Sequence, residues 1–437
     1  MISFIIRDNP DLDHIFPIIY FFLKKNESIN ILNFEINLDL NLDPKITFLK
    51  ERYPENVKIY EIYNINGNRL FLDRIINFLS SPKYKKVNFK NLTYIKKNNF
   101  LYNILFYFIA YMKKIVFKSK SFYETCLFGE SWAENIFNKI QISGLVMDDS
   151  YYFNYTRPQA LINIIKKKKI KITLVPHTCH MFKRDEDIEN LKSKNLNNFY
   201  PNIAVTSKRM KKILHNCGIN SKKIKILGSA RFCKENLNLL KKIYKKNNSN
   251  FSISNKIKFN NSKLRVLYID GAYDDHLEKI DLLNSIDSLN YVSLTIKAHP
   301  RGSFNLGNKN LQKKKYNNTN FNVDFTTPTK QLIEEGDIII ATYSSILVEA
   351  MLLKKKIILP KYFLKQHSGF EIFYENHNIA NLCHNKQEVL FLINLFKTRK
   401  NLNNLTNKNL NSFICDYVYG GQADSSKILD FYYNLIN

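Results

Sequence analysis

Short apolar segments alternate with helical segments along most of the chain, and this alternation constrains the fold more than any other feature. The apolar runs of strand length are residues 2–6, 29–34, 143–147, 170–175, 202–206, 224–227, 265–269, 293–297, 337–341 and 356–359. Helical spacing is found at residues 18–23, 158–167, 207–217, 346–353 and 425–436. Strands that alternate with helices predict an α/β fold with doubly wound sheets.

The length of the chain predicts two such domains. Its 437 residues exceed the size at which one hydrophobic core usually stops growing. Residues 245–263 are polar, rich in Asn and Ser, and without apolar periodicity, which is typical of a linker. We therefore expect two Rossmann-like domains facing a cleft, at 1–244 and 264–415, and a C-terminal helix within 416–437 that crosses back to the first domain.

The charge of the chain is strongly basic, at a formal +28. Such an excess can attract nucleic acid. However, the lysines are spread over the whole chain among many Asn and Ile residues, as an AT-rich coding sequence produces. We interpret the charge as a generic basic surface and expect no nucleic-acid partner. The alternative is a real preference for anionic partners, such as a phosphate-bearing ligand, an acidic glycan or the inner face of a membrane.

Cysteine spacing and the N-terminus predict a cytoplasmic protein. The six cysteines form no CxxC pair, so neither a zinc knuckle nor a disulfide framework is expected. Residues 1–14 lack the basic start and long apolar stretch of a signal peptide. The most apolar window, residues 101–112, is too short to span a bilayer and is expected to be a buried or interfacial helix.

Polar residues follow the predicted strands of the second half, where ligands bind in open α/β sheets. Tyr343, Ser344 and Ser345 stand between a strand and a helix. Two hydroxyls there suit a phosphate, although a serine at that position can also simply cap the helix. Glu349 lies one turn after Ser345, where its carboxylate can bind ribose hydroxyls or face solvent.

An earlier strand of the second half ends at His299, Pro300 and Arg301. The imidazole and the guanidinium would form a cationic pair beside the same crevice. A histidine there can donate to a phosphate or protonate a leaving group, or it can be an ordinary loop residue.

The first half also has polar strand ends. Asp148 and Asp149 end one predicted strand and His177 follows the next, so a carboxylate and an imidazole share one rim. Either type can serve as a general base, whereas an Asp-Asp pair can also be only a turn. His180 lies three residues beyond His177 without a supporting cluster, so no metal site is predicted. No GxGxxG, GxxxxGK[ST] or GxSxG motif occurs, which disfavours nicotinamide dehydrogenases and P-loop NTPases.

Several motifs occur in a recognisable order: LVMDD (145–149), LVPHTCH (174–180), NIAVTS (202–207), KILGSARF (225–232), KAHPR (297–301), DIIIATYSSILVEAMLLKKKIILP (337–360) and VYGGQADSS (418–426). In this order they resemble bacterial GT-B transferases of capsule and teichoic-acid synthesis. That group includes CDP-glycerol glycerophosphotransferases, polysialyltransferases and capsular Kdo transferases.

The resemblance implies a transferase that moves a sugar or polyol phosphate from a CMP- or CDP-linked donor to a glycan or lipid-linked acceptor, without a cofactor. It implies that the first domain binds the acceptor, with Asp148, Asp149 and His177 as catalytic candidates. It implies donor binding by His299, Pro300, Arg301, Tyr343, Ser344, Ser345 and Glu349, together with Gly228 and Arg231 of a Gly-x-x-Arg turn. Peripheral contact with the inner face of the plasma membrane fits the same role.

Two other functions stay open. A non-hydrolysing sugar-nucleotide 2-epimerase has the same double Rossmann form and would need no acceptor. A polyanion-binding or nucleic-acid-binding protein would use the basic charge and would show steeply salt-dependent affinity.

Overall fold

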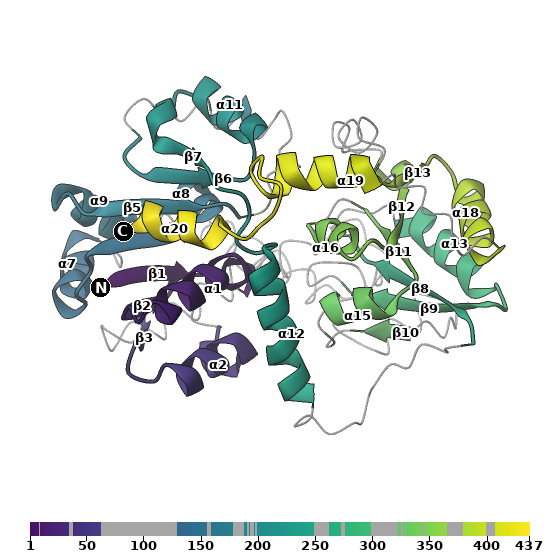
Figure 1. Ribbon diagram of the computed structural model, residues 1–437, viewed down its shortest axis with the longest axis horizontal. Helices are drawn as coiled ribbons and strands as arrows, with labels where there is room; N and C mark the ends of the chain where they lie inside the picture. The colour runs from purple at the N-terminus through teal and green to yellow at the C-terminus, as the bar shows by residue number, and fades with distance from the viewer. Residues whose placement is uncertain are drawn as a thin grey trace, which may run out of the picture.

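The computed structural model describes residues 1–7, 9–34, 38–62, 129–154, 159–177, 188–189, 192, 196, 199–248, 262–271, 276–298, 322–324, 327, 329–342, 345–364, 379–398 and 407–437. They form two α/β units, each built around a parallel sheet (Figure 1). We call the one with the first sheet the first unit and the other the second unit.

The first sheet has seven strands in the order β3-β2-β1-β4-β5-β6-β7, all parallel. Its strands are β1 (Ile2–Ile6), β2 (Ile29–Asn33), β3 (Val57–Glu61), β4 (Gly144–Asp148), β5 (Lys171–Val175), β6 (Asn202–Val205) and β7 (Ile224–Ile226). The helices of this unit are α1 (Asn9–Lys24), α2 (Pro44–Arg52), α7 (Glu130–Lys139), α8 (Asp149–Asn154), α9 (Gln159–Lys167), α11 (Lys208–Asn216) and α12 (Lys234–Asn248). Every residue of β2 and β4 is buried, as expected for strands with helices on both faces.

The second sheet has six parallel strands in the order β10-β9-β8-β11-β12-β13. Its strands are β8 (Leu264–Ile269), β9 (Val292–Lys297), β10 (Asn322–Asp324), β11 (Ile338–Ala341), β12 (Lys356–Pro360) and β13 (Asn381–Cys383). The helices are α13 (His276–Asp287), α15 (Thr329–Glu335), α16 (Ile346–Leu352), α18 (Lys386–Thr398) and α19 (Asn407–Phe413), the last continued by a π-helical turn at Ile414–Val418. A core of Ile, Leu, Val and Phe side chains joins this sheet to its helices.

Both sheets reverse their winding direction beside their first strand. In the first sheet β1 lies between β2 and β4, and in the second sheet β8 lies between β9 and β11. Ligands in open α/β sheets bind at such points, outside the carboxyl ends of the strands. The predicted architecture of two doubly wound Rossmann-like domains is confirmed.

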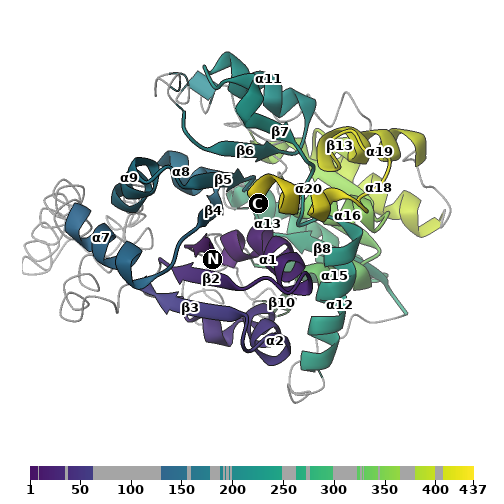
Figure 2. The same ribbon diagram turned by 60° about the vertical axis from the view of Figure 1, so that its left-hand side comes forward.

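The last helix, α20 (Ile428–Ile436), returns to the first unit, as the sequence predicted, and lies beside α1 in both ribbon views (Figures 1 and 2). Tyr432 is fully buried there, and its hydroxyl donates to the carbonyl oxygen of Gly228 over 2.8 Å. The Tyr433 hydroxyl donates to Glu27 over 2.8 Å. The first unit is therefore completed by residues from the far end of the chain.

Some sequence expectations fall at or beyond the edge of the described residues. The predicted linker, 245–263, has its first four residues inside α12, and residues 249–261 lie outside the described part, as does the apolar window 101–112. Among the described helices, none is long and apolar enough to cross a membrane.

The cysteines that the structure describes are free thiols, namely Cys217, Cys233, Cys383 and Cys415. Cys126 and Cys179 belong to the residues that are not described.

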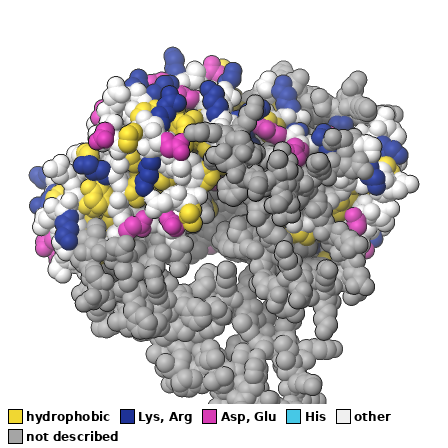
Figure 3. All heavy atoms as spheres, turned by 90° about the horizontal axis from the view of Figure 1, so that it is seen from below, with side chains coloured by type: hydrophobic (Ala, Val, Ile, Leu, Met, Phe, Trp, Pro, Cys, Tyr) yellow, Lys and Arg dark blue, Asp and Glu magenta, His cyan; other side chains and the backbone are white. Residues whose placement is uncertain are grey.

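The surface seen from below in Figure 3 carries both kinds of charge. On its described part, Lys and Arg side chains are interspersed with Asp and Glu side chains and with apolar patches. The described part of this face is therefore of mixed charge and forms no continuous basic track.

Candidate active site

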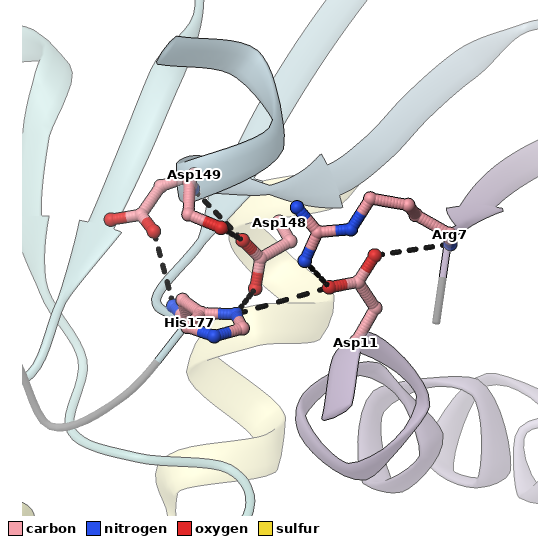
Figure 4. A network of polar contacts seen from close by, with 6 residues as sticks. Arg7, Asp11, Asp148, Asp149 and His177 are labelled. Carbon is pink, nitrogen blue, oxygen red and sulfur yellow. Dashed lines mark hydrogen bonds and ion pairs between the residues drawn. The ribbon is translucent and has the colours of Figure 1, made fainter. Parts of the chain in front are cut away.

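Five polar residues meet at the carboxyl end of the central strands of the first sheet (Figure 4). Arg7 follows β1, Asp11 lies in the first turn of α1, Asp148 ends β4, Asp149 begins α8, and His177 follows β5. The parallel pairing of β1 with β4 and of β4 with β5 places these strand ends side by side. The group therefore lies at the point where the first sheet reverses its winding.

His177 and Asp148 form a hydrogen-bonded pair. Nδ1 of His177 lies 2.8 Å from Oδ2 of Asp148. A proton on Nδ1 of His177 makes this contact a hydrogen bond to the carboxylate, and the neutral form of the ring then has its lone pair on Nε2. The other Asp148 oxygen accepts from the backbone N–H of Ser150 over 2.8 Å and from its hydroxyl over 2.6 Å. The Asp148 side chain is fully buried, whereas the His177 side chain is 30% exposed and therefore partly accessible.

Asp149 forms a hydrogen bond with the backbone of His177 and none with its ring. Its Oδ1 accepts from the His177 backbone N–H over 3.1 Å, which fixes the chain just after β5. The sequence pattern predicts three catalytic candidates without ranking them: Asp148, Asp149 and His177. The geometry separates them: Asp148 orients the imidazole, and Asp149 holds the segment that carries it.

Three further residues lie at the site: Arg7, Asp11 and His14. The sequence did not predict that they would lie there. Arg7 donates to Asp11 through its backbone N–H over 3.0 Å and through its guanidinium over 2.8 Å. Oδ1 of Asp11 lies 3.8 Å from Nδ1 of His177, and the buried ring of His14 packs at 5.2 Å from that of His177. An Arg and several Asp residues directly after the first strand could have indicated a polar site. However, only the order of the strands shows that this segment lies beside the end of β4.

The environment of His177 favours its charged form. Burial by itself would lower the pKa of this imidazole, but the hydrogen bond to Asp148 and the charges of Asp148, Asp149 and Asp11 raise the pKa above 6.5. An imidazole with a raised pKa is a stronger base, and the same carboxylates stabilise the imidazolium that forms when it accepts a proton.

Asp11, Asp148 and His177 are also close enough to share a cation, since one donor atom of each lies within 4.8 Å of the others. Two observations favour a hydrogen-bond network instead. The guanidinium of Arg7 already balances Asp11, and Nδ1 and Oδ2 are separated by a hydrogen-bond distance of 2.8 Å. Metal ligands at about 2.1 Å from a shared ion would usually be further apart.

Two of the residues predicted to bind a donor in the second unit are described. Ser345 precedes α16 and makes no side-chain capping hydrogen bond, so the helix-capping interpretation does not hold for it. Glu349 is buried, which excludes the solvent-facing alternative, and it accepts from Arg231 over 2.8 Å. His299, Pro300, Arg301, Tyr343 and Ser344 lie outside the described residues, as does His180.

The turn after β7 joins the two units. Gly228 has a φ of +82°, and a Cβ there would lie 2.9 Å from the backbone of Tyr419, so the close approach requires glycine. Arg231, three residues further, reaches Glu349 of the second unit. The donor-binding role that the resemblance implies for Gly228 and Arg231 stays a prediction.

Similar architecture is found in several solved structures. UDP-GlcNAc 2-epimerase from Methanocaldococcus jannaschii is 15% identical, with a TM-score of 0.57, over 99% of this chain and 99% of that chain. UDP-GlcNAc 2-epimerase from Neisseria meningitidis, bound to UDP-GlcNAc, is 12% identical, with a TM-score of 0.56, over 99% and 98%. The glycotransferase of kitacinnamycin is 9% identical, with a TM-score of 0.51, over 100% and 98%.

These similarities extend over nearly the whole of each chain and define the fold class. The protein has the GT-B architecture of two Rossmann-like domains. No protein-family model matches the sequence, and no curated protein matches it.

Proposed function

We propose that the protein is a sugar-nucleotide enzyme in which His177, oriented by Asp148, is the general base. The observation that carries this proposal is the 2.8 Å hydrogen bond between Nδ1 and the buried carboxylate, at the carboxyl end of the central strands. That bond leaves Nε2 to accept a proton from a bound substrate. The same arrangement of an acid behind an imidazole orients the base in many hydrolases and transferases.

The first form of the proposal is a transferase of bacterial surface polysaccharide synthesis. Nε2 of His177 takes the proton of an acceptor hydroxyl, the hydroxyl oxygen attacks the activated donor, and the nucleotide leaves with the bonding electrons. The donor is CMP- or CDP-linked and is held by the second unit through the segments around residues 299 and 344. The acceptor is a glycan or a lipid-linked glycan at the inner face of the plasma membrane. The motif order supports this form.

A second candidate is a sugar-nucleotide 2-epimerase. Two of the structurally similar proteins described above are UDP-GlcNAc 2-epimerases, and one of them is bound to UDP-GlcNAc. In this case the base would take a proton from a ring carbon of the donor itself. Epimerisation would proceed with no acceptor present.

Isotope exchange separates the two candidates. The protein is incubated with UDP-GlcNAc in D₂O without an acceptor and followed by proton NMR. An epimerase produces a second sugar nucleotide and replaces a carbon-bound hydrogen by deuterium. A transferase leaves that sugar unchanged and releases free nucleotide once a CMP- or CDP-linked donor and an acceptor are supplied.

Binding is tested separately by thermal shift with CMP, CDP, UDP, GDP and ADP, because a ligand that binds the native state raises Tm. We expect selective stabilisation by CMP or CDP for the transferase and by UDP for the epimerase. His177→Gln should keep the shift and lose turnover. Absence of a shift with all five nucleotides would contradict both candidates.

A further inference from the structure

Four side chains of alternating charge form a row from the first unit to the second. The contacts along it are 2.6 Å from Lys45 to Asp13, 4.0 Å from Asp13 to Arg231, and 2.8 Å from Arg231 to Glu349. Lys45 lies in α2, Asp13 in α1, Arg231 in the turn after β7, and Glu349 in α16 of the second unit. We call these four residues the charge row.

Arg231 has two carboxylates beside one terminal nitrogen. Its Nη2 is 2.8 Å from Oε1 of Glu349 and 4.0 Å from Oδ2 of Asp13. The two carboxylates belong to different units, so a relative movement of the units changes their separation. The pair with Glu349 is largely shielded, with side chains 15% and 10% exposed.

Asp13 is held in place independently of Arg231. Nζ of Lys45, whose side chain is 5% exposed, donates to Asp13 over 2.6 Å and lies 3.5 Å from Asp43. Burial by itself would raise the pKa of Asp13, but the charges of Lys45 and Arg231 hold it below the usual value. Asp13 is therefore ionised at neutral pH.

The backbone at Arg231 is anchored while its side chain has a choice of partner. Asn236 donates to the Arg231 carbonyl oxygen over 2.7 Å, and Ala230 and Cys233, which flank Arg231 and Phe232, are buried in the core of the first unit. A change from one carboxylate to the other therefore requires mainly a rotation of the side chain.

We propose that Arg231 exchanges between two carboxylates, pairing with Glu349 when the units are together and with Asp13 when they separate. Breaking a shielded ion pair is costly mainly because it leaves a charge without compensation. A second carboxylate beside the guanidinium removes that cost in the separated state. The charge row thus makes both arrangements accessible, as hinge movement between two domains requires. This inference does not depend on the proposed function.

Single-molecule FRET tests the exchange. Fluorophores are attached through non-natural amino acids at Lys212 in α11 and Phe391 in α18, which are exposed residues, one in each unit. Glu349→Gln weakens the pair of the joined state, so the ratio of long-distance to short-distance molecules should rise about tenfold. Asp13→Asn weakens the pair of the separated state and should lower that ratio by a similar factor.

Lys386→Gln is the matched control, because it removes an ion pair with Asp281 inside the second unit and should leave the distances unchanged. Opposite shifts in the two variants support the exchange. A longer distance between the fluorophores in both variants would mean that Arg231 is a static bridge. An unchanged distance in both would mean that the charge row does not govern the arrangement of the units. Either result would overturn the proposal. Should Glu349→Gln fail to fold, Asp13→Asn still decides, since lengthening or no change contradicts the exchange.

Discussion

His177 shows how one imidazole acquires a defined role from its neighbours. Asp148 fixes which ring nitrogen carries the proton, and Asp149 fixes the backbone that carries the ring. The sequence could place all three at one rim because each follows a strongly apolar strand. It could not rank them, since the difference lies in which atom of His177 each carboxylate reaches.

His177 should bind its proton more tightly in the folded protein than in the unfolded chain. Its raised pKa means that the charged form contributes stability that is fully present below pH 6.5 and lost as the pH rises through the folded-state value. NMR of ring-labelled histidine should show the His177 resonance titrating above 6.5. In Asp148→Asn the main cause of the increase is gone, and the resonance should titrate at a lower pH.

Asp281→Asn is the control, because this exposed residue lies in the second unit and pairs with Lys386. The His177 resonance should titrate in this variant as in the unaltered protein. If the pKa of His177 were the same in Asp148→Asn as in the unaltered protein, the hydrogen bond to Asp148 would not be the cause of its increase.

At the scale of elements, the strongly apolar strands were predicted within about a residue of their observed bounds, whereas β3, β10 and β13 were missed. β3 and β13 are edge strands with partly exposed residues, and β10 is an edge strand of three residues. A strand with one open side needs fewer apolar residues, so its sequence signal is weaker. Arg7, Asp11 and His14 were missed for a related reason, since their place depends on the strand order.

The hydroxyl of Tyr432 should strengthen the packing of α20 against the first unit. Tyr432→Phe removes the donor to the Gly228 carbonyl oxygen in a fully buried position, so the free energy of unfolding should fall by about 1–3 kcal/mol. Urea unfolding measures the change. Tyr433→Phe is the matched control, because its bond to Glu27 is partly exposed and its loss should cost less. Equal losses in the two variants would contradict the importance that we give to the Gly228 contact.

At the scale of the whole molecule, the sequence predicted two α/β domains and a final helix that returns to the first. Chain length, the alternation of segments and the helical spacing of residues 425–436 were sufficient for this. The contacts between the units were not predictable, because they join residues far apart in the chain, such as Arg231 and Glu349.

Removal of residues 428–437 tests the contribution of α20 to the whole. The truncation takes Ile428, Leu429, Tyr432 and Ile436 from the core of the first unit, and each buried side chain of this size contributes about 1.5–3 kcal/mol. We expect hydrogen exchange to become faster throughout the first unit. Phe431→Ala alters an exposed residue of the same helix and should change stability by about 0.5 kcal/mol or less. Unchanged exchange in the truncated protein would contradict this role.

The return of α20 has a consequence for synthesis on the ribosome. Most of the first unit precedes the second unit in the chain, yet part of its core is supplied by a helix that is translated after the second unit. Domains generally fold as they emerge, N-terminal parts first. Here the apolar surface beside α1 stays uncovered in the nascent first unit until α20 has left the ribosome, so we expect the first unit to complete its folding only after that point.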